Sequence, residues 1–135
     1  MKIVKAKKEY AKKIWEIRNH PLVRMSSGNT EVISLEDHIP WFEKKYFSDQ
    51  DNFCFVLENE NREVISYCRF DFDNENDSYI TSIAIELDYH GQGLGHKLLS
   101  GAFEKFEIKK MITAEIKKDN IVSVKLFEKN ENRFL

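Results

Sequence analysis

Two kinds of hydrophobic pattern alternate along the chain and predict a mixture of strands and helices. Short apolar runs rich in β-branched and aromatic residues, which are typical of strands, recur through the sequence. They occupy residues 2–5, 53–57, 64–70, 80–85 and 111–116. Apolar residues three and four positions apart, which are typical of helices, fill most of the segments between the strands. These predicted helices span residues 9–18, 40–47, 94–106 and 121–128.

Proline and small polar residues predict where the first two helices begin and end. Pro21 ends the first helix, because a residue that precedes proline avoids the helical region of backbone space. Residues 24–32 are rich in serine, glycine and asparagine, which is typical of a loop. Ser34 is a candidate N-cap for the second helix. Because Pro40 would remove a hydrogen bond, we expect one turn before it and the main helix from Pro40 to Phe47.

The order of the predicted elements indicates the fold class. The polar residues 59–62 predict a turn between two strands, and residues 73–77 predict a second turn into the strand at 80–85. The order is therefore strand, two helices, three antiparallel strands, helix, strand, helix. It predicts an α/β fold with a mixed, mostly antiparallel sheet flanked by helices. A chain of 135 residues is expected to form one domain, residues 1–135.

The stretch between the strand at 80–85 and the helix at 94–106 carries the first candidate site. Four of the five glycines of the chain lie in or just after this connection, at positions 91, 93, 95 and 101. Free N–H groups and the helix dipole make the start of a helix a binding site for anions, so a phosphate or pyrophosphate is the expected ligand. The motif is not a P-loop, because His96 follows Gly95 where a lysine is required. It also lacks the GxGxxG spacing of a dinucleotide site. The alternative is a helix start that merely contains glycines.

Two motifs in this half of the chain resemble those of the GNAT superfamily of N-acetyltransferases. The first reads His90-Gly91-Gln92-Gly93-Leu94-Gly95 and is similar to the family's Arg/Gln-x-x-Gly-x-Gly/Ala, although a histidine replaces the usual Arg or Gln. The second reads Asn120-Ile-Val-Ser123-Val-Lys-Leu126-Phe127-Glu-Lys129 and resembles the family's Asn, small residue and Leu-Tyr/Phe-Glu-Lys pattern. The resemblance implies the GNAT fold and acetyl-CoA as cosubstrate.

The same resemblance implies which residues bind acetyl-CoA. The expected set is Ile83, Ala84, Ile85, His90, Gly91, Gln92, Gly93, Leu94, Gly95, His96 and Asn120. In the family, the loop binds the pyrophosphate, and the strand edge holds the pantetheine arm by main-chain hydrogen bonds. A splay between the strands at 80–85 and 111–116 would admit the cosubstrate. The main-chain N–H of Ile85 is the implied donor to the oxyanion.

Acetyl transfer to an amine also needs a proton acceptor, because an alkyl ammonium group has a pKa of about 10. Glu115 is the candidate general base, since it aligns with a glutamate of ribosomal-protein N-terminal acetyltransferases. The alternative is a surface glutamate on a strand. Glu86 and Asp88 are weaker candidates near the glycine loop.

The leaving thiolate lacks its usual proton donor. Phe127 stands where many GNAT members carry a tyrosine, and Tyr79 or Tyr89 could substitute for it. A thiol pKa of about 8.5 makes the thiolate a tolerable leaving group without such a donor.

The first half of the chain carries a weaker resemblance, to GNAT enzymes that acetylate nucleotide-linked amino sugars. It rests on Arg18, Asn19, Pro21, Val23, Arg24, His38, Trp41 and Phe42. The resemblance implies a small-molecule amine substrate that is bound by Arg18, Asn19 and Trp41. The sequence features of this subgroup overlap with those of acetyltransferases that act on protein N-termini.

Composition excludes several other classes of function. A net charge of −2 argues against nucleic acid as the main partner. No apolar run reaches the length of a membrane span, and no signal peptide is evident, so a cytoplasmic location is expected. Cys54 and Cys68 lie in strand-like runs and are expected to be buried thiols. The histidines are too scattered to indicate a metal site.

Two further expectations concern the end of the chain and the activity. GNAT members usually continue into two more strands, whereas this sequence ends with Asn132-Arg133-Phe134-Leu135. We therefore expect a shortened C-terminus, an exposed edge on the strand at 111–116 and a homodimer. The leading hypothesis is an acetyl-CoA-dependent N-acetyltransferase that acts on a primary amine. The alternatives are an acyl-CoA-binding module with little catalysis and a protein N-terminal acetyltransferase.

Overall fold

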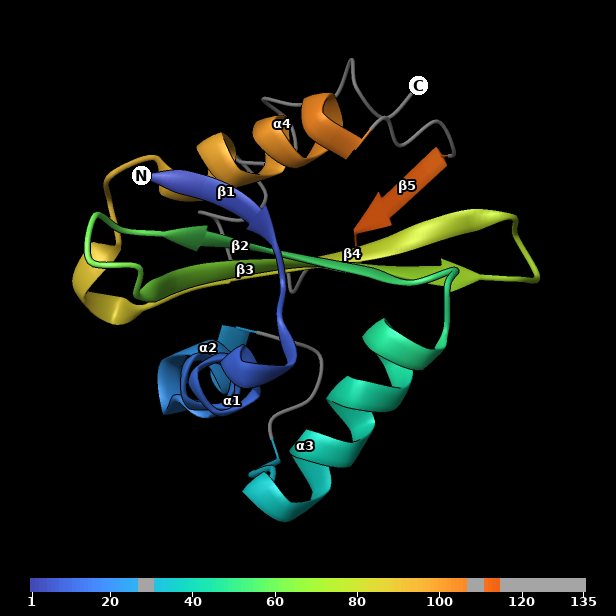
Figure 1. The fold of residues 1–135 in the computed structure, drawn as a ribbon, viewed down its shortest axis with the longest axis horizontal. Helices are drawn as coiled ribbons and strands as arrows, with labels where there is room; N and C mark the ends of the chain where they lie inside the picture. Colours follow the sequence, from blue (N-terminus) through green and yellow to red (C-terminus); the bar gives the residue numbers. More distant parts are fainter. Residues whose placement is uncertain (27–30, 107–110, 115–135) are drawn as a thin grey trace.

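The described part of the chain is built around a five-stranded sheet (Figure 1). The computed structural model describes residues 1–26, 31–106 and 111–114. The strands lie in the order β1 (Lys2–Lys5), β2 (Phe53–Glu58), β3 (Val64–Asp73), β4 (Ser78–Ile85), β5 (Met111–Ala114). Neighbouring strands from β1 to β4 are antiparallel, and β5 pairs with β4 in parallel. The predicted mixed, mostly antiparallel sheet is confirmed.

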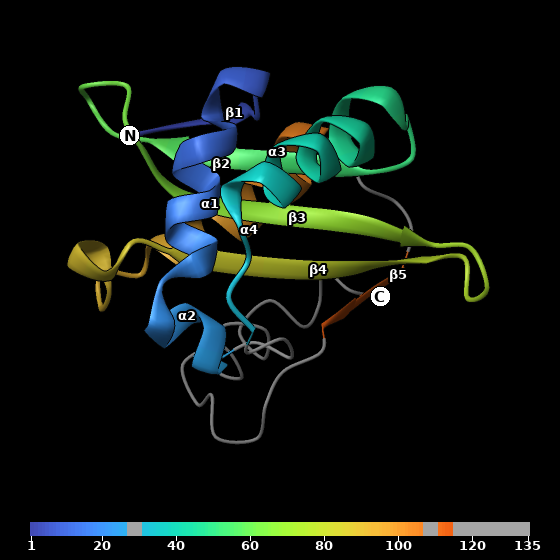
Figure 2. The ribbon, with the colours of Figure 1, turned by 90° about the horizontal axis from the view of Figure 1, so that it is seen from below.

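Helices cover both faces of this sheet (Figures 1 and 2). On one face lie α1 (Ala11–Asn19), α2 (Pro21–Ser26) and α3 (Leu35–Glu43), and α4 (Leu94–Phe106) covers the other. Two short 3₁₀ turns, η1 (Lys8–Tyr10) and η3 (Leu87–Tyr89), and a π-helical turn, η2 (Lys44–Ser48), complete the described elements.

Alternation along the strands divides the core into two layers, because successive side chains point to opposite faces. Phe55 and Leu57 of β2 pack on the α4 side of the sheet. Their neighbours Cys54 and Val56 pack on the opposite side, against α1 and α3. In β3, Phe70 faces α4 and Tyr67 faces α1 and α3. The predicted burial of both cysteines is confirmed, one in each layer.

Two local expectations from the sequence are wrong. Residues 21–26 form the helix α2, so residues 24–26 are helical and do not belong to the expected loop. Pro21 occupies the first helical position, where the missing N–H group costs nothing. The helix α3 also runs without a break through Pro40. His38 and Phe42, on either side of Pro40, are fully buried, so packing against the sheet holds the two turns in line.

The predicted cap of α3 is confirmed: the Ser34 hydroxyl accepts a hydrogen bond from the Asp37 N–H at 3.2 Å. Residues 115–135 lie outside the described part of the chain, and so do the expected helix at 121–128 and the second family motif. The expected edge and homodimer depend on that region and stay predictions. Among the described residues, no helix combines the length and apolar character needed to cross a bilayer.

Candidate active site

The glycine loop between β4 and α4 has an unusual backbone and open space above it. Gly91 and Gly93 have φ values of 79° and 72°, in the left-handed region that favours glycine. A Cβ atom built on either residue would meet no described atom within 4 Å. The Gly93 carbonyl accepts a hydrogen bond from the Lys97 N–H at 3.2 Å, which begins α4. The loop therefore leaves open space beside the start of α4, where the N–H groups of the first turn have no acceptor within the helix.

His90 fixes the start of this loop to the end of β4. Its Nε2 lies 2.8 Å from the Ile85 carbonyl oxygen, so the ring folds back onto the strand. Tyr89 also joins the loop to the neighbouring β2–β3 turn, since its hydroxyl lies 3.5 Å from the Asn59 Nδ2. The phosphate contact expected of His90 stays a prediction, and in this conformation its ring organises the loop.

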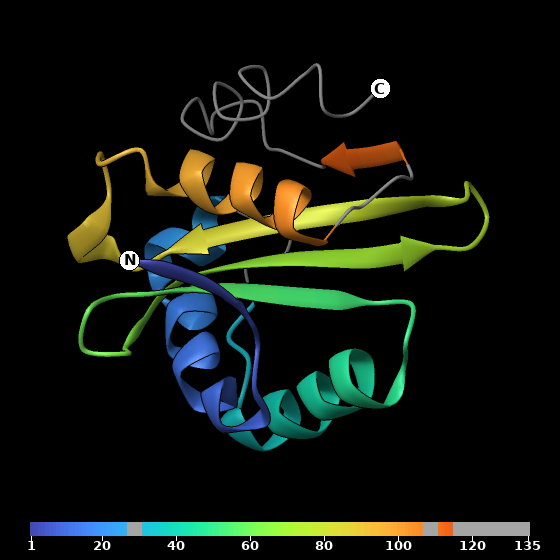
Figure 3. The same cartoon turned by 45° about the horizontal axis from the view of Figure 1, so that its top comes forward.

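The second half of β4 has one edge that the described strands leave open. The Glu86 N–H donates to the Ile65 carbonyl at 2.9 Å, which places the even-numbered residues of β4 in hydrogen bonds with β3. Because this pattern alternates, the main-chain groups of Ile83 and Ile85 point the opposite way. On that side β5 pairs only with Ser78 to Thr81 (Figure 3). Among the described strands, none pairs there with Ile83 or Ile85.

Arg18 and Trp41, two of the three predicted substrate residues, lie together. The Arg18 guanidinium carbon is 4.2 Å from the Trp41 ring centroid. Asn19 has a structural contact, since its side-chain oxygen accepts from the Ile33 N–H at 2.9 Å. Its expected contact with the substrate stays a prediction. The Asn19 carbonyl accepts from the Arg24 Nε at 3.0 Å, so Asn19 contacts both α2 and the segment that precedes α3.

Four residues that the sequence analysis did not identify complete this cluster around Trp41. The Lys45 Nζ and the Arg69 guanidinium carbon lie 5.4 and 5.3 Å from the Trp41 ring centroid. Asp71 accepts a hydrogen bond of 2.5 Å from the Tyr46 hydroxyl. It also lies 3.3 Å from Lys45 and 3.7 Å from Arg69. The sequence feature that could have identified Arg69 and Asp71 is their Arg-x-Asp spacing within an apolar strand, which places both charges on one face of the sheet.

We call Arg18, Trp41, Lys45, Tyr46, Arg69 and Asp71 the Trp41 cluster. Burial, and then the charge of Arg69, lower the pKa of Arg18. Burial, and then the charge of Arg18, lower the pKa of the adjacent His38 to about 4. His38 is therefore neutral at pH 7, and its Nδ1 lies 3.4 Å from the Arg18 Nη1.

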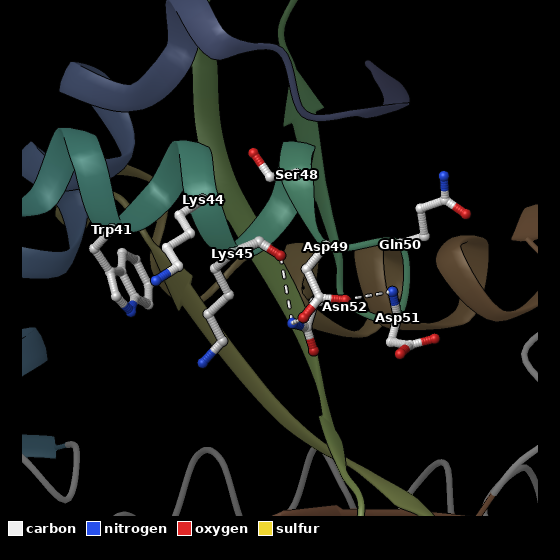
Figure 4. Close-up of a pocket in the computed structure, with 8 residues that line it drawn as sticks. All are labelled: Trp41, Lys44, Lys45, Ser48, Asp49, Gln50, Asp51 and Asn52. Atoms are coloured by element: carbon white, nitrogen blue, oxygen red, sulfur yellow. Dashed lines mark hydrogen bonds between the residues drawn. The ribbon is translucent and has the colours of Figure 1, made fainter.

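A groove of about 700 Å³ opens beside the Trp41 cluster (Figure 4). It is lined by Trp41, Lys44, Lys45, Ser48, Asp49, Gln50, Asp51 and Asn52. In Figure 4, the side chains of Trp41 and Lys45 extend from the same side of the helix. Because the groove and the cluster share these two residues, the cluster is open to solvent on its Lys45 side.

The other candidates for proton transfer have different surroundings. The Glu86 carboxylate lies 2.8 Å from the Lys13 Nζ, so it is engaged in an ion pair between α1 and the end of β4. Asp88 is exposed in η3, and Tyr79 is buried among the aromatic rings of the α4-side core. Glu115 lies outside the described residues, as do Asn120 and Phe127.

Comparisons with known proteins agree with this architecture. The profile of the acetyltransferase (GNAT) family matches residues 12–131. The L-amino acid N-acyltransferase MnaT of Escherichia coli is 27% identical over 135 residues, which is 95% of this chain and 77% of that protein.

Two solved structures illustrate the likeness of the fold. The ribosomal-protein-alanine N-acetyltransferase of Brucella melitensis superposes with a TM-score of 0.82 at 23% identity, covering 96% of this chain and 83% of that one. A Salmonella typhimurium protein described as a candidate acetyltransferase, solved with its cofactor acetyl-CoA, gives 0.80 at 25% identity over 96% and 78%. Because the family profile spans well over half of the sequence, this chain belongs to the GNAT family of acetyltransferases.

Proposed function

We propose that this protein is an acetyl-CoA-dependent N-acetyltransferase that acetylates a primary amine of a small molecule. The observation that carries the proposal is the glycine loop at the start of α4. Gly91 and Gly93 hold it in a conformation that leaves open space above the backbone. The N–H groups at the start of α4 are suited to the pyrophosphate of CoA, because a helix N-terminus favours anions. The Salmonella typhimurium relative that is solved with acetyl-CoA supports this assignment.

The open edge of β4 continues from the loop and provides main-chain partners for the rest of the cosubstrate. Ile83 and Ile85 direct their N–H and carbonyl groups to this edge, which suits the amides of the pantetheine arm. Acetyl-CoA, when bound, supplies the acetyl group as a thioester. The Ile85 N–H would donate to the carbonyl oxygen as negative charge develops on it.

Glu115 is our proposed general base. It follows Ala114, the last residue of β5, and β5 lies next to β4 in the sheet. In the reaction a C–N bond forms, the C–S bond breaks, and the proton of the attacking amine passes to the carboxylate directly or through water. The ion pair with Lys13 makes Glu86 less available for this role.

Two observations bear on the chemical class of the amine substrate. The relative from Escherichia coli is named for L-amino acids, and the first half of this sequence resembles enzymes of nucleotide-linked amino sugars. Both are small molecules with a primary amine, so both classes belong in an acceptor screen.

Calorimetric titration with CoA and a thiol-release assay with acetyl-CoA test the proposal together. We expect Gly93→Val to abolish CoA binding while circular dichroism stays unchanged, because a β-branched residue at positive φ strains the loop and its side chain enters the open space. We expect Glu115→Gln to retain CoA affinity and to lower the transfer rate by about a hundredfold or more.

The loss caused by Glu115→Gln should shrink at high pH, where more amine is already deprotonated. Unchanged CoA affinity in Gly93→Val would remove the loop from the binding site. A wild-type protein that binds CoA but acetylates neither class of amine would favour an acyl-CoA-binding module.

A further inference from the structure

We propose that the acceptor carries an anionic group, a carboxylate or a phosphate, and that Arg18 and Arg69 bind this group beside Trp41. The inference rests on the proposed acetyl transfer, and it adds the chemical class of the acceptor and the residues that recognise it.

The Trp41 cluster has more positive than negative charge. It contains three cationic side chains, from Arg18, Lys45 and Arg69, which approach one indole ring. Asp71 is the one carboxylate that the described part of the chain contributes to it. This carboxylate is already bound by Lys45 and the Tyr46 hydroxyl, and Arg69 lies near it at 3.7 Å.

Among the described residues, Arg18 has no counterion within ion-pair distance. Its guanidinium stacks on Trp41 and approaches a neutral His38, and in the described part of the chain it forms no ion pair. Burial and the like charge of Arg69 both oppose its ionisation. An anion bound beside Arg18 and Arg69 would offset this repulsion and would accept hydrogen bonds from the guanidinium N–H groups.

Arg69 supplies a second, independent observation. Its Nε is buried and has no hydrogen-bond partner among the described residues. Buried polar groups are nearly always satisfied, so an unsatisfied N–H inside a cationic cluster indicates a missing acceptor. A carboxylate or phosphate has the two adjacent oxygens that match the planar fork of an arginine.

The position of Arg69 links this anion site to the proposed acetyl-transfer site. Arg69 pairs with Ser82 of β4, directly before the open edge at Ile83. Residues in such a hydrogen-bonded antiparallel pair have Cα atoms about 5.5 Å apart. The backbone of Arg69 therefore lies one strand away from the strand that carries the edge proposed for the thioester.

A binding experiment that needs no turnover tests the anion site directly. With CoA saturating, so that the glycine loop is filled, thermal unfolding is followed while inorganic phosphate replaces sodium chloride at constant ionic strength. The rise of the midpoint gives an apparent dissociation constant for phosphate. We expect Arg18→Gln to weaken it by about tenfold or more, as for the loss of a charged hydrogen bond.

The matched control is Lys12→Gln, which removes one positive charge from the exposed side of the same helix. It should leave the phosphate affinity unchanged, and Arg18→Lys should retain part of it. Equal phosphate affinity in the wild type and in Arg18→Gln would overturn the proposal. The test uses Arg18→Gln and does not depend on a variant of the buried Arg69, such as Arg69→Gln, being able to fold.

A kinetic comparison then distinguishes the two sources of the anion. An α-amino acid is compared with its amide, and a phosphorylated amino sugar with the dephosphorylated sugar. We expect kcat/KM to favour the charged member of one pair by about tenfold or more, and Arg18→Gln to abolish that preference. Equal kcat/KM within both pairs would overturn the proposal. If the protein does not bind CoA, the proposed function is wrong. The anion site is tested separately, because the difference in phosphate binding between the wild type and Arg18→Gln can still be measured.

Discussion

At the scale of single residues, burial decides what His38 can do. The ring is 1% exposed and stacks on Phe42 with centroids 5.8 Å apart. Burial, and then the Arg18 charge, lower its pKa from 6.5 to about 4. The side chain is therefore a neutral part of the α1/α3-side core, and it makes the folded state sensitive to acid.

We predict that His38 causes a loss of stability between about pH 6.5 and pH 4. Above this range the ring is neutral in both the folded and unfolded states. Within the range the unfolded state binds a proton that the folded state does not, so the free energy of unfolding falls as the pH falls. The total loss is up to about 3 kcal/mol, at about 1.4 kcal/mol per pKa unit.

Urea unfolding of the wild type and His38→Phe at a series of pH values measures this effect. In the His38→Phe variant, the free energy of unfolding should depend less on pH in this range. The control His20→Gln, at a partly exposed position, should show the same pH dependence as the wild type. An unchanged slope in His38→Phe would contradict the assignment.

At the scale of elements, close packing against β1 positions α4, and with it the glycine loop. A Cβ atom added to Gly101 of α4 would lie 2.1 Å from the Cδ1 of Ile3 in β1. Glycine at this position is therefore a packing requirement, although glycine in a helix interior is less favourable than alanine by about 1 kcal/mol.

We predict that Gly101→Ala and Ile3→Val are coupled. In the wild-type background, Gly101→Ala forces Ile3 out of its position, and such overpacking costs about 1–3 kcal/mol. In the Ile3→Val background the clashing methyl group is absent, so the helix-forming preference of alanine should prevail. A double-mutant cycle of unfolding free energies measures the coupling, and additive effects would show that the contact does not limit the packing.

At the scale of the whole molecule, the two helical layers bury both thiols. Cys54 belongs to the layer beneath α1 and α3, and Cys68 belongs to the layer beneath α4. Burial raises the pKa of both thiols, that of Cys68 to about 12. Neither cysteine has the thiolate character or the exposure that thiol chemistry requires.

We predict that native protein does not react with a colorimetric thiol reagent, and that both cysteines react at the rate of global unfolding. Both sit on central strands, where opening requires loss of the core. Labelling rates at increasing urea concentration, compared with unfolding rates, check this expectation. Rapid labelling of one cysteine under native conditions would indicate local opening of its layer. Slow labelling also keeps the background low in the assay for released CoA.

Much of the fold was predictable because strand and helix patterns are local. The alternating and β-branched runs predicted all five described strands, and the polar residues 59–62 predicted the β2–β3 hairpin. The glycine loop was also predictable from the sequence, since glycine is favoured where φ is positive, as at Gly91 and Gly93. These features depend on residues that are close in the sequence, so the sequence alone determined them.

Only the tertiary structure decided the composition of the Trp41 cluster and the course of the chain at the two prolines. Arg18, Trp41 and Arg69 come from α1, α3 and β3, and no local pattern brings them together. The continuous helix through Pro40 likewise depends on the burial of its neighbours against the sheet. Such features arise where side chains from distant segments share one space, because packing and burial there outweigh the local preferences that a sequence pattern expresses.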